Sequence, residues 1–218
     1  MIIKRIKLEN YTVFEDHQIE FDPGINIFIG ENGTGKTHLF KVLYSACQCV
    51  DQRVSFSHKL VSTMLPDDYK ISRLITRKQG NRSALIRIFA GEREITQERV
   101  LNASFHGKTK KWEAEVTGEK GWDEPESNIN PSYISIIVEL LLELQRKGVQ
   151  VFVSTHDYMI VSYFEVRKAK NDSIAFHSLS HVGKTCDLIY EKKEKIADLK
   201  NNAIVSAFDK LLDEIYDL

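Results

Sequence analysis

The sequence predicts an α/β fold, in which a mostly parallel sheet is flanked by helices and joined to an antiparallel β meander. Residues 24–29 form a continuous apolar run that is typical of a buried parallel strand, and a helical apolar pattern follows directly. A long apolar helix and a second buried strand follow one another within residues 133–153. Short β-rich segments separated by glycine over residues 71–116 indicate the meander.

Length and composition indicate one soluble globular domain covering residues 1–218. The chain is 42% hydrophobic and 28% charged, and 218 residues are enough to bury one sizeable core. Its net charge of −1 lacks the basic excess of a dedicated nucleic-acid binder. We interpret the local lysine groups as solvated surface rather than a DNA track. These groups are Lys108, Lys110 and Lys111, and Lys192, Lys193 and Lys195.

The three cysteines are too few and too oddly spaced for a disulfide framework, and the N-terminus has no signal-peptide pattern. We therefore expect a cytoplasmic protein. The longest apolar run, residues 133–144, is too short and too interrupted to span a bilayer, so no membrane association is expected. A metal site is an alternative use of some residues, although the spacing matches no usual zinc template. Its candidate ligands are Cys47, Cys49, His177, His181 and Cys186.

The first half of the chain is predicted to begin with a hairpin, residues 2–8 and 17–21, with a polar turn around Glu15 and Asp16. A helix is predicted over residues 37–49, because its apolar residues recur at helical spacing. A short helix over 59–64 should stop at Pro66. The predicted strands of the meander are 74–76, 84–90, 94–101 and 111–116.

The second half is predicted to contain the strongest helix, residues 133–147. Asn130 is its expected N-cap, Pro131 its first residue and Gly148 its C-terminal stop. A strand over 149–153 and a hairpin of 173–180 with 185–191 should follow. The last helix should begin near Asn202 and dock on the body through one apolar stripe. The stripe comprises Ile204, Ala207, Phe208, Leu211, Leu212 and Ile215.

Residues 30–37, GENGTGKT, match the phosphate-binding loop G-x-x-x-x-G-K-[ST] between a strand and a helix. Glycines let successive backbone N–H groups and the helix N-terminus point at one anion. Lys36 would reach the β- and γ-phosphates, and the Thr37 hydroxyl would ligate Mg²⁺. A glycine-rich turn with an accidental lysine fits the flanking elements less well. The candidate nucleotide-binding residues are Gly30, Asn32, Gly33, Thr34, Gly35, Lys36, Thr37 and His38.

Hydrolysis also requires an acidic group near the metal and a group that activates water. Asp123 and Glu124 supply two consecutive carboxylates, and His156 lies just past a predicted strand, where ligands bind in open α/β sheets. Taken alone, the two carboxylates are more typical of a solvated turn. A lone His156 is more typical of a helix cap or of the core.

With these motifs in place, the sequence resembles the ABC-type ATPase heads of the RecF and structural-maintenance-of-chromosomes (SMC) kind. Within that class it resembles bacterial proteins usually called AAA-family or ATP-binding proteins. The resemblance rests on the first strand, the phosphate loop, the Walker B end with its D-loop, and the switch-histidine segment. These are residues 3–11, 21–39, 122–131 and 151–157.

The resemblance implies a role for each matching residue. Asp123 would hold Mg²⁺ through water, Glu124 would be the general base, and His156 would contact the γ-phosphate. It favours ATP over GTP, and it implies a homodimer in which two heads enclose two nucleotides. It leaves open a protein partner or DNA.

The sequence departs from this class in three places. Residues 115–122 are a polar, glycine-containing stretch where the class has an apolar Walker B strand, the signature segment is absent, and Gln79 is a weak Q-loop candidate. We interpret this as an internal deletion with its junction near 118–122. Its expected consequences are misplaced carboxylates and an exposed apolar patch on the helix over 133–144.

A second function therefore stays open beside ATP hydrolysis. The chain is then an ATP-responsive binding or scaffold module with little turnover, partnered with a nuclease, a toxin or a DNA-repair component. A third interpretation is a shortened remnant that binds nothing. Ligand-induced stabilisation separates the third from the first two.

Overall fold

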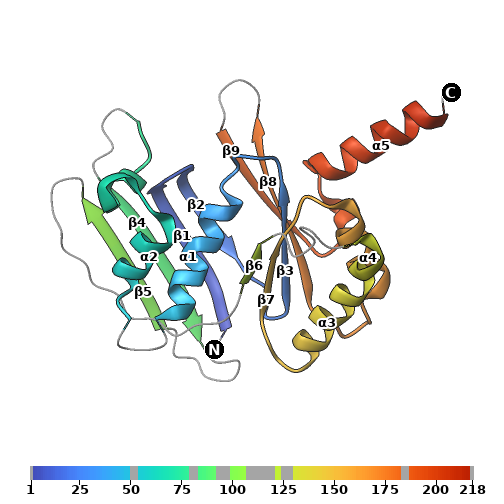
Figure 1. The fold of residues 1–218 in the computed structure, drawn as a ribbon, viewed down its shortest axis with the longest axis horizontal. Coiled ribbons are helices and arrows are strands. Elements are labelled where there is room, and N and C mark those ends of the chain that lie inside the picture. Colours follow the sequence, from blue (N-terminus) through green and yellow to red (C-terminus); the bar gives the residue numbers. More distant parts are fainter. Residues whose placement is uncertain are drawn as a thin grey trace. The chain divides into compact units, whose positions relative to one another are not determined.

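The computed structural model describes residues 2–49, 54–78, 83–91, 99–106, 121–123, 130–182 and 187–216 (Figure 1). The chain divides into two compact units. The first comprises Met1–Pro23 and Thr37–Gly121, and the second comprises Gly24–Lys36 and Trp122–Leu218. That the units fold together as one domain stays a prediction.

Unit 1 contains a four-stranded antiparallel sheet in the order β2-β1-β4-β5. Alternation places Ile6 opposite Ile88 and Leu8 opposite Ile86, and all four are buried. Tyr11 pairs with Phe14, so the first turn lies at residues 12–13 and the polar turn expected around residues 15–16 is wrong. The strands are β1 (Ile2–Tyr11), β2 (Phe14–Glu20), β4 (Ser83–Gly91) and β5 (Arg99–His106).

The helices of unit 1 are close to those expected. Helix α1 spans Lys36–Gln48, and α2 spans Phe56–Met64 and ends before Pro66. The predicted strand over 74–76 is wrong, because Leu74 ends a 3₁₀ turn, Ile71–Leu74, and Ile75 forms one isolated bridge to Tyr11. Strand β4 confirms the predicted strand over 84–90, and β5 pairs with it antiparallel as a meander requires. The bounds predicted for the next strand, 94–101, are wrong at their end, because β5 continues to His106. Residues 92–98 and 107–120 lie outside the described residues.

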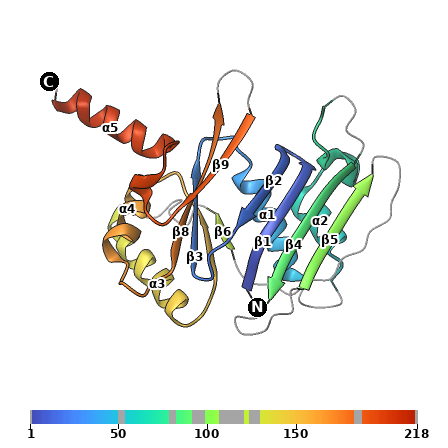
Figure 2. The same ribbon diagram turned by 180° about the vertical axis from the view of Figure 1, so that it is seen from behind.

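Unit 2 contains a five-stranded sheet in the order β6-β7-β3-β8-β9 (Figure 2). The central strand β3 is parallel to both neighbours, and β8 and β9 form the predicted antiparallel hairpin. The expectation of a polar loop up to Trp122 is wrong at its end, because residues 121–123 form the edge strand β6. The strands are β6 (Gly121–Asp123), β7 (Val151–Ser154), β3 (Ile25–Gly30), β8 (Ile174–Val182) and β9 (Asp187–Lys193).

Asn130 caps the helical segment that leads into α3, as predicted. Its side-chain oxygen accepts the Ser132 backbone N–H at 3.0 Å, Pro131 follows, and Gly148 past the C-terminus has a φ of +87°. Helix α4 was not predicted. The helices of unit 2 are α3 (Ile134–Arg146), α4 (Tyr158–Arg167) and α5 (Ala203–Tyr216), with short 3₁₀ turns at Pro131–Tyr133 and Ile196–Asp198.

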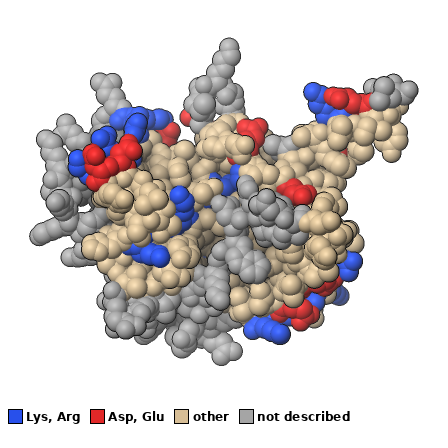
Figure 3. Space-filling model, in the orientation of Figure 1, with Lys and Arg blue, Asp and Glu red and all other residues tan. Residues whose placement is uncertain are grey.

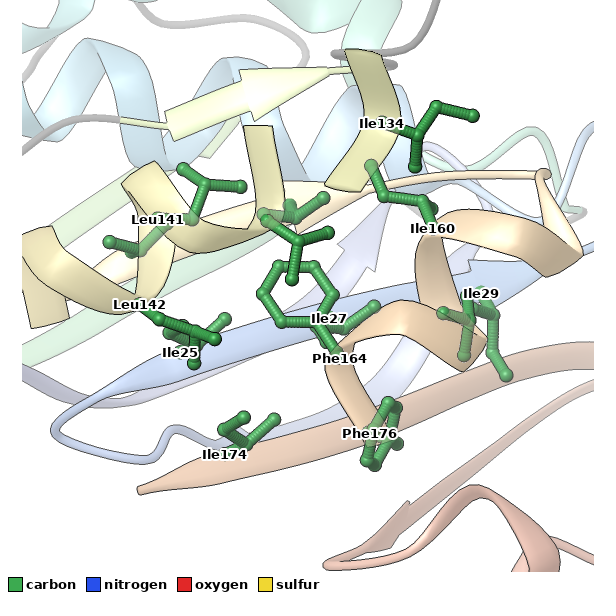
Figure 4. Close-up of a cluster of buried hydrophobic side chains, with 14 of the residues drawn as sticks. Ile25, Ile27, Ile29, Ile134, Leu141, Leu142, Ile160, Phe164, Ile174 and Phe176 are labelled. Atoms are coloured by element: carbon green, nitrogen blue, oxygen red, sulfur yellow. The ribbon is translucent and has the colours of Figure 1, made fainter. Parts of the chain in front are cut away.

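The core of unit 2 lies between the sheet and helices α3 and α4 (Figure 4). Ile25, Ile27 and Ile29 point from β3 toward these helices, because alternate residues of a strand share one face. Figure 4 shows Phe164 of α4 next to Ile27. Burying a side chain of this size stabilises a fold by about 1.5–3 kcal/mol. The central position of β3 therefore fixes the loop that follows it.

One flank of α3 and the turn that precedes it stay exposed. Tyr133, Ile136 and Leu140 are 56%, 53% and 58% exposed. The apolar patch expected on this helix is thus present. A side-chain ion pair of 2.9 Å from Arg167 to Glu139 joins α4 to the α3 surface.

Charges of both signs lie close together wherever they gather on the face shown in Figure 3. None of the described helices combines the length and apolar character needed to cross a bilayer.

Candidate nucleotide-binding site

Strand β3 delivers the phosphate loop from the centre of the sheet. All six of its residues are buried, and it ends at Gly30. Gly30 has a φ of +150° and pairs with Leu179, and a Cβ at this position would lie 2.0 Å from the Leu179 carbonyl oxygen. No larger residue fits here without moving the backbone. The loop therefore begins at a position that requires glycine.

Two further glycines shape the loop. Gly33 and Gly35 have φ values of +82° and +90°, a region in which residues with a Cβ are strained. Helix α1 begins directly afterwards at Lys36. Its first N–H groups have no partner within the helix and carry positive partial charge. The loop therefore leads into a favourable site for an anion.

Lys36 is held by the loop itself. Its side chain is buried, and its Nζ donates to the carbonyl oxygens of Gly30 and Glu31, both at 2.8 Å. Nζ also lies 3.5 Å from Thr34 Oγ1. These contacts place a cation inside the phosphate loop.

The other predicted loop residues differ in exposure. Thr34 is buried, and its hydroxyl donates to the Glu31 carbonyl oxygen at 2.9 Å, so its side chain stabilises the loop. Asn32, Gly33 and Thr37 are exposed. His38 is half-buried, and burial, together with the nearby Lys41 charge, lowers its pKa. A neutral imidazole is therefore favoured at this position.

His156 emerges at the same edge of the sheet as the loop. Strands β3 and β7 are parallel, Phe28 pairs with Ser154, and the Thr155 N–H donates to the Phe28 carbonyl oxygen at 3.0 Å. Two residues beyond this pair lie Gly30 on one strand and His156 on the other. The structure thus brings the predicted histidine to the end of the sheet that carries the loop.

The alternative interpretations of His156 do not fit its position. It is exposed, so it is not a core histidine. The N-cap of α4 is Asp157, whose Oδ1 accepts the Met159 N–H at 2.6 Å, and the Asp157 N–H donates to Thr155 Oγ1 at 2.9 Å. Sequence reasoning missed Thr155 and Asp157, which fix this turn. An aspartate directly before an apolar run was the available signal.

The predicted carboxylates are placed only in part. Asp123 is the last residue of β6, and β6 neighbours β7, the strand that precedes His156. Glu124 lies outside the described residues, as do Gln79 and Cys186. Within the described part of the chain, no group of three His, Cys, Asp or Glu side chains is arranged to hold a metal ion.

His177 belongs to a buried polar cluster formed by β3, β8 and β9. Its ring stacks on Phe28 at 4.3 Å between centroids, and its Nε2 and Nδ1 lie 3.0 Å from Asn26 Oδ1 and 2.9 Å from the Tyr190 hydroxyl. Asn26 Oδ1 only accepts, so Nε2 carries the hydrogen and Nδ1 accepts from Tyr190. Full burial, and secondarily the Lys192 charge, hold the His177 pKa well below its usual value.

Because of His177, the free energy of unfolding should decrease as the pH is lowered. Above pH ~6.5 neither state binds a proton at this residue; below it the unfolded chain gains one that the folded state rejects, so unfolding is favoured. Between pH 7.5 and 5.5 we expect wild type to lose about 1.4 kcal/mol more free energy of unfolding than His177→Gln. Urea unfolding at both pH values measures this difference. Equal losses in the two proteins would contradict the assignment.

A family model described as an AAA domain matches residues 5–217. The chain belongs to this AAA-domain family. Among its relatives, a DNA replication and repair protein RecF from Streptococcus agalactiae serotype Ia is 34% identical over 88 residues, which are 40% of this chain and 24% of that protein. RecF from Phocaeicola vulgatus is 47% identical over 49 residues, 22% of this chain and 13% of that protein. The chain thus aligns with a quarter or less of these relatives' lengths.

Two solved structures show that the fold is that of an SMC head. The SMC head domain from Thermotoga maritima has a TM-score of 0.59 at 11% identity, over 89% of this chain and all of that one. An SMC head solved in complex with the C-terminal winged-helix domain of ScpA has a TM-score of 0.62 at 10% identity, over 91% of this chain and all of that one. The class predicted from sequence, a RecF- and SMC-like P-loop ATPase, is confirmed, as is the α/β fold.

Proposed function

We propose that this member of the AAA-domain family binds ATP with Mg²⁺ at the loop over residues 30–37 and hydrolyses it. The observation that carries the proposal is the placement of Lys36. Its ammonium group is held inside a loop that three positive-φ glycines shape, at the edge of the sheet where His156 also emerges. A buried cation beside a helix N-terminus suits a polyanionic ligand.

Each loop residue has a role in this proposal. Backbone N–H groups from Asn32 to Lys36 surround the β-phosphate, and the Lys36 ammonium neutralises the β- and γ-phosphates. Thr34 contributes through its backbone, since its hydroxyl is used within the loop. The nearby His38 stays uncharged beside the nucleotide.

The metal and water sites combine Thr37, the last residue of the loop, with oxygen and nitrogen groups from outside the loop. The Thr37 hydroxyl and the Asp123 carboxylate supply the oxygen ligands that Mg²⁺ prefers, Asp123 through water. Bound Mg²⁺ would supply charge neutralisation at the phosphates. Glu124 takes a proton from the attacking water, and His156 donates a hydrogen bond to a γ-phosphate oxygen. The P–O bond to ADP breaks as the bond to water forms, and phosphate leaves.

Two further points come from the family resemblance. ATP is favoured over GTP as the nucleotide. Two chains would form a homodimer that encloses two nucleotides. The protein would act in the cytoplasm. The alternative function is an ATP-responsive scaffold with little turnover, whose partner is a nuclease, a toxin or a DNA-repair component, or DNA. One of the two similar SMC heads was solved bound to a winged-helix domain of ScpA, which supports a protein partner.

Binding is tested by thermal unfolding with and without Mg-ATP. At an ATP concentration 100 times its Kd, we expect the free energy of unfolding of wild type to rise by about 2.7 kcal/mol. That of Lys36→Ala should not change. Because Lys36 also bonds the loop, isothermal titration of the folded variant should confirm the loss of binding. Lys41→Ala, a lysine of the same helix, is the matched control and should keep the wild-type gain. Absence of any gain in wild type would contradict the proposal and leave a remnant that binds nothing.

A further inference from the structure

Helix α5 carries one apolar stripe, which we define as Ile204, Phe208, Leu211, Leu212 and Ile215. Spacings of four, three and four residues separate Ile204, Phe208, Leu211 and Ile215. This spacing is the seam by which one helix packs along another. The stripe therefore has the spacing of a face that packs along another helix.

The first half of the stripe docks on the body of unit 2. The Phe208 ring stacks on Tyr158 of α4, with 4.1 Å between ring centroids, and Ile204 packs against the core cluster. Asn202 caps this end, since its Oδ1 accepts the Val205 N–H at 3.2 Å. The helix is thus anchored at its N-terminal end.

The second half extends away from the helices and strands of unit 2 (Figures 1 and 2). Leu211 is 51% exposed, Ile215 53% and Tyr216 83%. This corrects the expectation that the whole stripe docks on the body. We call these three residues the α5 tip. The tip continues a face that elsewhere in the helix packs on protein.

The charges beside the tip are mainly acidic. Asp209, Asp213 and Glu214 are accompanied by one base, Lys210, whose Nζ lies 4.0 Å from a Glu214 carboxylate oxygen. Asp209 and Asp213 form no ion pair with any described residue. A second copy of α5 would bring the same negative charges to the interface, whereas a basic helix would neutralise them.

The size of the α5 tip also favours a partner helix over a second copy of this chain. Two half-exposed aliphatic side chains and the largely exposed Tyr216 offer roughly a few hundred Å² of apolar surface, in the range of functional surface patches. A stable dimer buries about 800 Å² on each partner. We propose that the α5 tip binds an amphipathic helix of a protein partner whose apolar stripe is flanked by lysine or arginine. This goes beyond ATP binding and does not depend on it.

Two synthetic peptides test the proposal with the full chain. Both carry the same leucine seam, and their flanking positions are all lysine in one and all glutamate in the other. We expect the lysine peptide to bind at least tenfold more tightly by fluorescence anisotropy, and its affinity to fall as salt rises. Leu211→Asp with Ile215→Asp should abolish binding at an unchanged unfolding midpoint.

Two further variants separate this surface from general stickiness. Val166→Asp, at a residue of α4 that is 77% exposed, is the matched control and should bind the lysine peptide like wild type. Asp209→Lys with Asp213→Lys should reverse the preference to the glutamate peptide. Equal binding of both peptides, binding of neither, or loss in Val166→Asp would overturn the proposal. So would a dimer in sedimentation that the tip variant dissolves, because the occupant would then be a second copy.

Discussion

Replacing Gly30 with alanine is expected to destabilise the protein by about 3 kcal/mol or more. Two costs combine at this residue. The new Cβ would lie 2.0 Å from the Leu179 carbonyl oxygen, and the φ of +150° is unfavourable for any residue with a side chain. The backbones of Gly30 and Leu179 cannot easily move apart, because β3 and β8 are paired strands of the sheet. Urea unfolding of the two proteins measures the difference.

Gly33→Ala is the matched control within the same loop. Gly33 has a φ of +82°, but no heavy atom lies within 4 Å of a Cβ built there. Only the backbone strain applies, so the cost should be about 1 kcal/mol. If the two variants lose equal stability, the close approach of β3 and β8 at Gly30 is not what requires glycine.

Glu124→Gln is expected to lower the rate of ATP hydrolysis by about 10²–10⁴-fold while leaving ATP affinity within a few-fold of wild type. Glutamine has nearly the shape of glutamate but cannot accept the proton from the attacking water. The loss should therefore appear in kcat and not in the dissociation constant. Phosphate release and equilibrium titration measure the two quantities separately.

Glu126→Gln tests whether the effect belongs to this one carboxylate. It removes the same charge two residues along the chain and should leave kcat close to wild type. Unchanged turnover in Glu124→Gln would exclude Glu124 as the base. ATP binding without turnover in wild type would instead favour the scaffold function.

The sequence was most informative where local chemistry determines local structure. Glycine spacing, an apolar run and a helical period together located β3, the loop and α1, with α1 observed one residue earlier than predicted. Asn130 and Pro131 located the start of the helical segment before α3 for the same reason, since a cap and a missing N–H act within one turn. The position of His156 followed from the strand that precedes it.

The predictions were wrong or missing where contacts between residues distant in sequence determine the structure. Helix α4 is rich in β-branched and aromatic residues that are unremarkable helix formers, and its burial against α3 and the sheet outweighs that. Strand β6 exists because β7 offers it a pairing edge, although its own residues do not form a strand pattern. The exposed end of α5 could not be anticipated, because an apolar stripe has the same pattern whether it is covered or not.

The placement of β3 has a consequence for how the protein is made. Its pairing partners, β7 and β8, come after the whole second segment of unit 1 in the chain. During synthesis β3 therefore remains unpaired for on the order of ten seconds, until β7 and β8 have been made. The sheet of unit 1 is built only from strands of unit 1, so it can assemble first. The phosphate loop is thus among the last features to mature, and newly made chains halted before β8 would expose an unpaired strand prone to aggregation.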